Sequence, residues 1–222
     1  MPTTWGNIKE EQMDAFRDVT KSYIGDSELL RMLRRVLRMI GRGQAYTFQQ
    51  KETVLTLTGA QQYDLETLLP RWCRIISITN PVSQDAAVPL EMDYMDIKNF
   101  ALTVDRFAYS IIGNRYLRVF SPTQSPLSGS LRIIWCTSDL CVDGTTNETK
   151  ALPTSDNDYF LIPERFMETV IEGLNKLSFR KDRSNRADQT DSEKAFNDAL
   201  AEMQLMETIQ VDAPVRDMQG AW

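Results

Sequence analysis

The sequence contains no histidine among its 222 residues. Ser-His-Asp hydrolases, Cys-His proteases and imidazole-ligated metal sites all need this side chain, and these classes are therefore excluded. Cysteine is scarce as well, since only Cys73, Cys136 and Cys141 are present. Cys136 and Cys141 lie close in sequence but have one further thiol and no imidazole to complete a metal site. We predict buried, reduced thiols, and no catalytic, cofactor or metal site.

Long hydrophobic runs are also missing. No stretch of 18 apolar residues could span a bilayer, and residues 1–11 lack the apolar core of a signal peptide. We therefore expect synthesis in a cytoplasm and no membrane partner. The net charge of −6 argues against a protein that coats nucleic acid with its whole surface. The hydrophobic fraction of 42% is typical of a folded globular protein.

The first 43 residues have helical periodicity. A helix is predicted from Asp26 or Ser27, either of which can cap it, to Ile40, with Gly41 as its end. Its apolar residues share one face: Leu29, Leu30, Leu33, Val36, Leu37 and Ile40. Its basic residues share the opposite face, called here the arginine face: Arg31, Arg34, Arg35, Arg38 and Arg42.

The period changes to two after residue 50, which predicts strands. The predicted strands are Thr53–Thr58, Arg71–Thr79, Tyr109–Ile112, Tyr116–Phe120 and Leu131–Cys136. Gly113-Asn114 predicts a hairpin turn between two of them. Residues 90–102 fit either a short helix or an irregular strand pair.

Helical periodicity returns near the C-terminus. Pro163 favours a helix start, and Thr190-Asp191-Ser192-Glu193 is a capping-box pattern. Residues 142–158 are polar and predict a long exposed loop. The predicted organisation is N-terminal helices over 1–43, a β-rich region over 44–162, C-terminal helices over 163–209 and an extended arm over 210–222. The fold class is α+β, with an antiparallel β-sandwich or barrel inserted between terminal helices that pack together.

Several short sequence motifs occur in an order that resembles the order found in the head-to-tail adaptor (connector) proteins of tailed bacteriophages. These motifs are Tyr63-Asp64-Leu65 with Leu69-Pro70, Arg74-Ile75-Ile76-Ser77-Ile78, Pro89-Leu90, Tyr109-Ser110-Ile111-Ile112-Gly113-Asn114, Leu117-Arg118-Val119-Phe120-Ser121-Pro122, Leu131-Arg132-Ile133-Ile134-Trp135, Leu152-Pro153 and Ile162-Pro163-Glu164. Two departures are the inserted Glu66-Thr67-Leu68 and a tryptophan, Trp135, where the family has tyrosine. The resemblance spans roughly residues 45 to 206.

The resemblance implies a structural protein of the virion neck rather than an enzyme. It implies a homo-oligomeric ring, commonly of twelve copies, between the portal protein and the tail or gatekeeper proteins. DNA would pass through the lumen without specific binding. Two alternatives are another neck or tail protein, such as a gatekeeper or tube component, and a virion-associated peptidoglycan hydrolase.

The candidate partner interface has two parts. The arginine face could meet a neighbouring subunit or the portal, line a DNA channel, or be solvated or paired within the chain. Residues 187–222 carry eight acidic and two basic side chains, a net of −6, which suits arginine pairing between subunits. In the C-terminal arm, Val215, Met218 and Trp222 are candidates for docking on the portal or a neighbour.

Overall fold

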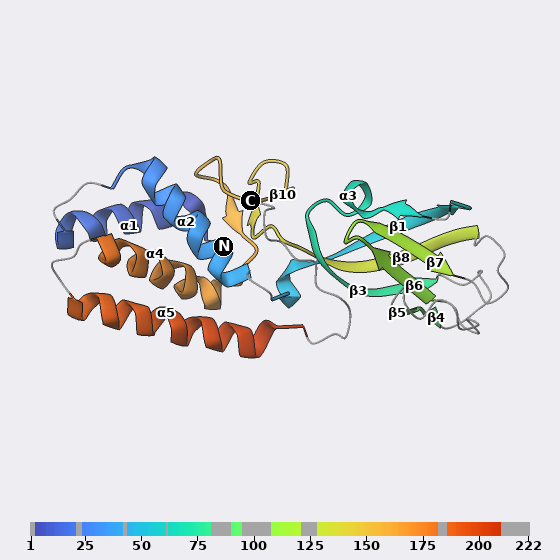
Figure 1. The fold of residues 1–222 in the computed structure, drawn as a ribbon. Helices are drawn as coiled ribbons and strands as arrows, with labels where there is room; N and C mark the ends of the chain where they lie inside the picture. The colour runs from blue at the N-terminus through green and yellow to red at the C-terminus, as the bar shows by residue number, and fades with distance from the viewer. Residues whose placement is uncertain are drawn as a thin grey trace. The chain divides into compact units, whose positions relative to one another are not determined.

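The computed structural model describes residues 3–20, 24–41, 44–60, 62–80, 90–94, 108–120, 128–181 and 186–209. They form two compact units, each with its own hydrophobic core (Figure 1). The helical unit joins two distant parts of the sequence, Met1–Gln49 and Asp139–Ile209. The strand unit occupies the intervening Gln50–Ser138. The predicted α+β class, with strands between terminal helices, is confirmed.

The helical unit contains the chain's long helices. These are α1 Trp5–Thr20, α2 Asp26–Gly41, α4 Met167–Lys181 and α5 Arg186–Glu207, with the 3-10 turns η1 Thr47–Gln49 and η3 Glu164–Phe166. A small antiparallel sheet, with strand order β10-β9-β11, completes the unit. Its strands are β9 Cys141–Val142, β10 Thr149–Lys150 and β11 Tyr159–Phe160.

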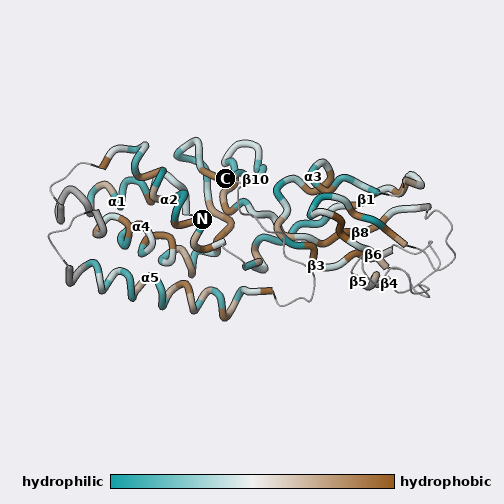
Figure 2. The backbone as a smooth tube through the Cα atoms, in the orientation of Figure 1, coloured by the Kyte–Doolittle hydropathy of each residue, from teal (hydrophilic) through white to brown (hydrophobic). Residues whose placement is uncertain are grey.

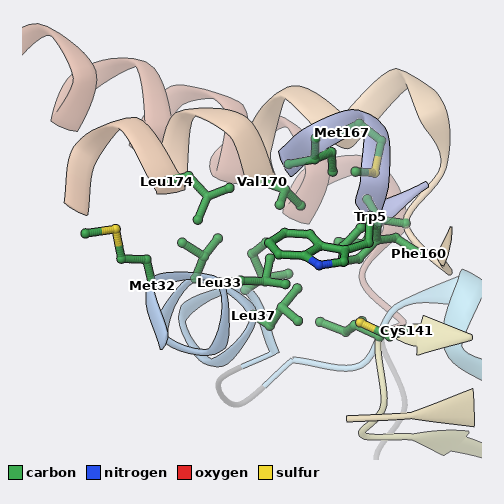
Figure 3. Close-up of a cluster of buried hydrophobic side chains, with 14 of the residues drawn as sticks. Trp5, Met32, Leu33, Leu37, Cys141, Phe160, Met167, Val170 and Leu174 are labelled. Atoms are coloured by element: carbon green, nitrogen blue, oxygen red, sulfur yellow. The ribbon is translucent and has the colours of Figure 1, made fainter. Parts of the chain in front are cut away.

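The terminal helices pack together, as predicted. Leu33 and Leu37 of α2 point toward Val170 and Leu174 of α4 in one buried cluster (Figure 3). The apolar spacing of α2 dictates this contact, because residues three and four apart share a helix face. The observed bounds of α2, Asp26–Gly41, agree with the predicted ones to within one residue.

Helix α4 lies between α2 and α5 (Figures 1 and 3). The close approach depends on Gly173. A Cβ atom placed there would lie 2.5 Å from Val36 Cγ1 of α2 and 3.0 Å from Phe196 Cε2 of α5. A side chain at this position would therefore push the neighbouring helices away.

The strand unit contains two four-stranded sheets, β1-β8-β3-β4 and β2-β7-β6-β5. The elements are β1 Gln50–Thr58, β2 Tyr63–Asp64, α3 Leu65–Leu68, β3 Trp72–Asn80, β4 Leu90–Glu91, β5 Asp93–Tyr94, β6 Ala108–Ile112, β7 Tyr116–Phe120 and β8 Ser128–Thr137. Side chains from both sheets share one buried cluster, which makes a sandwich. In the described strands neither sheet closes on itself, and the barrel alternative is therefore not realised.

The pairing in the strand unit is antiparallel, except for β5 and β6, which run parallel. The predicted hairpin turn is present. Gly113 and Asn114 both have positive φ, and the Arg115 N–H donates to the Ile112 carbonyl at 3.1 Å. Glycine and asparagine tolerate this backbone region best. Of the ambiguous stretch 90–102, the part up to residue 94 forms two short strands, and the rest lies outside the described residues.

The prediction of a long exposed loop over residues 142–158 holds for residues 144–148 and 154–157, which are exposed, but it missed the ordered part of the segment. Strands β9 and β10 and a buried carboxylate, Asp158, organise this segment. The Asp158 carboxylate accepts hydrogen bonds from the backbone N–H groups of Gly144, Thr154 and Ser155 at 3.1, 2.6 and 2.8 Å. Backbone donors stabilise a carboxylate without leaving a pattern in the sequence, and the polar composition was therefore misleading.

Candidate assembly surface

The arginine face of α2 projects away from the core. Arg31, Arg34, Arg35 and Arg38 are all exposed, whereas Leu33 and Val36 between them are fully buried. The segregation follows from the helical period, which turns the basic positions outward once the leucine stripe is buried. In Figure 2, α2 accordingly alternates between apolar and polar residues along its length.

The four exposed arginines are not neutralised by any residue that the structure describes. In the part of the chain that the structure describes, none of them has an ion-pair or hydrogen-bond partner. Other cations of the helical unit do have partners. For example, Lys9 Nζ lies 2.7 Å from Asp156 Oδ1, and Lys176 Nζ lies 3.1 Å from Glu193 Oε1.

The remaining predicted interface residues lie outside the described residues. They are Arg42, Val215, Met218 and Trp222. The structure therefore brings together four of the eight candidates on one helix, and the docking role of the arm stays a prediction.

Sequence reasoning missed a charged cluster in the helical unit. Lys150 Nζ lies 2.6 Å from Asp158 Oδ2 and 2.8 Å from Asp143 Oδ2. Burial opposes ionisation of Asp158, but the Lys150 ammonium and three backbone N–H groups lower the pKa of Asp158 to about 2. The hydrogen bond from Lys150 and those from the Thr146 and Thr145 N–H groups lower the pKa of Asp143. Because the lysine pairs with both carboxylates, the cluster is a fold-stabilising element.

The thiols lie where the sequence predicted. Cys73, Cys136 and Cys141 are buried, and no disulfide joins any two of them. Burial raises the pKa of Cys136 to about 12 and also raises that of Cys141. Both thiols therefore stay protonated near neutral pH, and a protonated thiol is a poor nucleophile.

Among the described residues, no group of three or more Cys, Asp or Glu side chains could hold a metal ion. None of the helices in this part of the chain combines the length and apolar character needed to cross a bilayer.

A protein-family model described as SU10 adaptor protein matches residues 3–217. The chain belongs to the SU10 adaptor protein family. The match includes both the helical and the strand unit. It is longer than the range of the sequence motifs, which spans roughly residues 45 to 206. It confirms the similarity to phage head-to-tail adaptors, and membership of the SU10 adaptor family supports a structural role in the phage particle. No curated protein matches the chain.

Proposed function

We propose that this SU10 adaptor family member forms a closed ring between the portal vertex and the tail of a tailed phage. The observation that carries the proposal is the family match over residues 3–217. Twelve copies, as is common in head-to-tail adaptors, would surround a lumen through which DNA passes without specific binding. Tail or gatekeeper proteins would attach to the opposite side of the ring.

The charge distribution supports a structural ring better than a DNA clamp. Each lysine or arginine on a phosphate adds salt-dependent affinity, which would slow the sliding of DNA. The net charge of −6 does not favour such contacts. Arginine also pairs with carboxylates in a two-pronged geometry, and the exposed arginines of α2 are available for a protein partner.

The test of the proposed function is the position of the protein in the particle. Electron cryo-microscopy of intact particles should place twelve copies of the chain around the neck axis, in contact with the portal. Density for the chain away from this axis, for example along the tail tube, would reject the adaptor position. A different copy number with the same position would revise only the stoichiometry.

The C-terminal arm is proposed to dock on the portal or on a neighbouring subunit through Val215, Met218 and Trp222. A buried tryptophan side chain contributes about 1.5–3 kcal/mol, and repeated contacts around a ring act together. Deletion of residues 212–222 should leave the melting temperature unchanged and abolish attachment to portal-bearing heads. Normal attachment of the truncated chain would contradict the proposal.

A further inference from the structure

Helix α5 has an outward face with the opposite charge to the arginine face. Its exposed charged residues between 190 and 206 are Asp191, Lys194, Asp198 and Glu202, a net of −2 (three acidic, one basic). In the described part of the chain, the three carboxylates have no ion-pair or hydrogen-bond partner. The helical unit therefore exposes one basic helix face and one acidic helix face, and neither face has a charged partner among the described residues.

The two faces belong to different helices and are separated within one chain. Val36 of α2 and Phe196 of α5 both approach Gly173 of α4, which lies between their helices (Figures 1 and 3). On α2, Arg38 follows the core residue Val36 by two positions, which is a rotation of about 200° around the helix. On α5, Asp198 follows Phe196 by the same step. On each helix the charged face therefore lies opposite the core residue. The two charged faces thus point away from the shared core.

The spacings of the two faces match. Arg31 and Arg38 are separated by seven residues, as are Asp191 and Asp198, which corresponds to about 10.5 Å along a helix. The four-residue step from Arg31 to Arg35 equals the step from Asp198 to Glu202. Two helices laid side by side can therefore bring several arginines opposite carboxylates.

An apolar patch lies beside the acidic stripe. Leu205 is 86% exposed and Met206 is 57% exposed, at the C-terminal end of α5. On α2, Leu30 and Met39 flank the arginines and are only partly buried. Stable interfaces combine such apolar contacts with charged residues near their rim.

We propose that the arginine face of α2 binds the acidic face of α5 in the next copy of this chain. The contact joins different surfaces of the two copies, and such a head-to-tail contact generates a ring when its rotation closes. The proposal rests on the proposed ring function and names the partner of the arginine face as a second subunit. The portal and DNA are the alternatives that the experiment must distinguish.

Charge reversal tests the proposal. One variant carries Arg31→Glu, Arg35→Glu and Arg38→Glu, and the other carries Asp191→Arg, Asp198→Arg and Glu202→Arg. In the first both faces are acidic, and in the second both are basic. Neither should assemble alone, because each contact would join like charges. An equimolar mixture should assemble with alternating copies, because every contact then joins opposite charges.

Self-association is measured by sedimentation velocity on the full chain and by the number of copies retained on portal-bearing heads. Each variant alone should lose association by at least about tenfold, and the mixture should recover most of it. A matched control for the α5 variant carries Glu10→Arg, Glu11→Arg and Glu168→Arg. These three exposed acids lie on other helices, and replacing them changes the net charge by the same amount as in the α5 variant. This control should assemble as the wild type does.

If a reversal variant fails to fold, Arg→Gln and Asp→Asn or Glu→Gln replacements at the same positions take its place. Each of these is expected to weaken association while retaining the wild-type melting temperature.

The outcomes separate this contact from the proposed neck position. A mixture that associates no better than its components overturns the pairing of α2 with α5. The same holds if the control weakens association as much as the α5 variant does. An alternating assembly in solution, from a chain that microscopy finds away from the neck, supports the contact and rejects the proposed function. Loss of portal binding by the α2 variant alone, with normal self-association, assigns the arginine face to the portal instead and rejects the contact.

Discussion

The helical unit and the strand unit differ in where their charged side chains lie. Among the described residues, all four buried charged side chains belong to the helical unit: Asp139, Asp158, Lys176 and Glu207. In the strand unit the ion pairs Glu52–Arg132 and Asp64–Arg115 lie at or near the surface. The helical unit joins two segments far apart in sequence. One of its buried charges, Glu207, accepts a hydrogen bond from Thr47 of the other segment, whereas Asp158 and Lys176 have their ion-pair partners within the second segment. The described residues of the strand unit come from one stretch of sequence, Gln50–Ser138, and pack around an apolar cluster.

The largest expected effect tests the apolar contact that joins the two halves of the helical unit. Leu33→Ala should lower the free energy of unfolding of this unit by about 2–5 kcal/mol, because Leu33 is fully buried against α4 and its loss leaves a cavity. Hydrogen exchange measured separately for the two units would show the loss in α2 and α4. Leu205→Ala, at a position that is 86% exposed, is the matched control and should change little. Equal loss in both units would mean that they unfold as one.

The second prediction concerns the buried ion pair of the helical unit. Asp158→Asn should lower the free energy of unfolding by about 1.5–3 kcal/mol at neutral pH, because the charged acceptor for Lys150 and three N–H groups is lost. The pKa of Asp158 in the folded chain is about 2, below the unfolded value of about 3.9. The stabilisation is therefore complete above about pH 4 and disappears as the pH falls toward 2.

Denaturant unfolding of wild type and Asp158→Asn between pH 7 and pH 2 checks this prediction. The two curves should converge at the acidic end. Asp156→Asn provides a control, since Asp156 is an exposed carboxylate paired with Lys9, and it should have a much smaller effect. A difference that stays constant down to pH 2 would show that charge is not the cause.

The third prediction uses the crowded glycine of α4. Gly173→Ala should destabilise the helical unit by about 1–2 kcal/mol, although alanine favours helix formation, because its Cβ would overlap Val36 and Phe196. Gly41→Ala at the end of α2 is the control, since the nearest atom to its added Cβ lies 4.0 Å away. Thermal unfolding of both variants checks the prediction. Stabilisation by Gly173→Ala would show that the helices can separate without cost.

The smallest effect is expected on the surface of the strand unit. Arg132 Nη2 lies 2.6 Å from Glu52 Oε2, and both side chains are about half exposed. Glu52→Gln should reduce stability only slightly, and the reduction should vanish at high salt. A large effect that persists at high salt would remove the contrast between the two units. The melting temperature at low and high ionic strength provides the measurement.

Much of the fold could be predicted from periodicity and turn chemistry. The bounds of α2 followed from its apolar spacing and Gly41, and the β6–β7 hairpin followed from Gly113-Asn114. The exposure of the arginine face was implied by the same spacing. Asp158 could not be found in this way, since its partners include backbone groups that no residue pattern reveals. The role of Gly173 depends on two helices that meet it from distant parts of the sequence.

The division of the chain also sets an order of events during synthesis. All the described strands of the strand unit have been made once Ser138 has been added, and Gln50 of β1 pairs with Cys136 of β8. Helix α2 is made earlier, yet its contact with α4 cannot form until α4 leaves the ribosome. At about 5–20 residues per second, this delay lasts roughly 7–30 seconds. During that time the leucines of α2 are open to chaperones, and the newest copies in the cell are the ones most prone to aggregate.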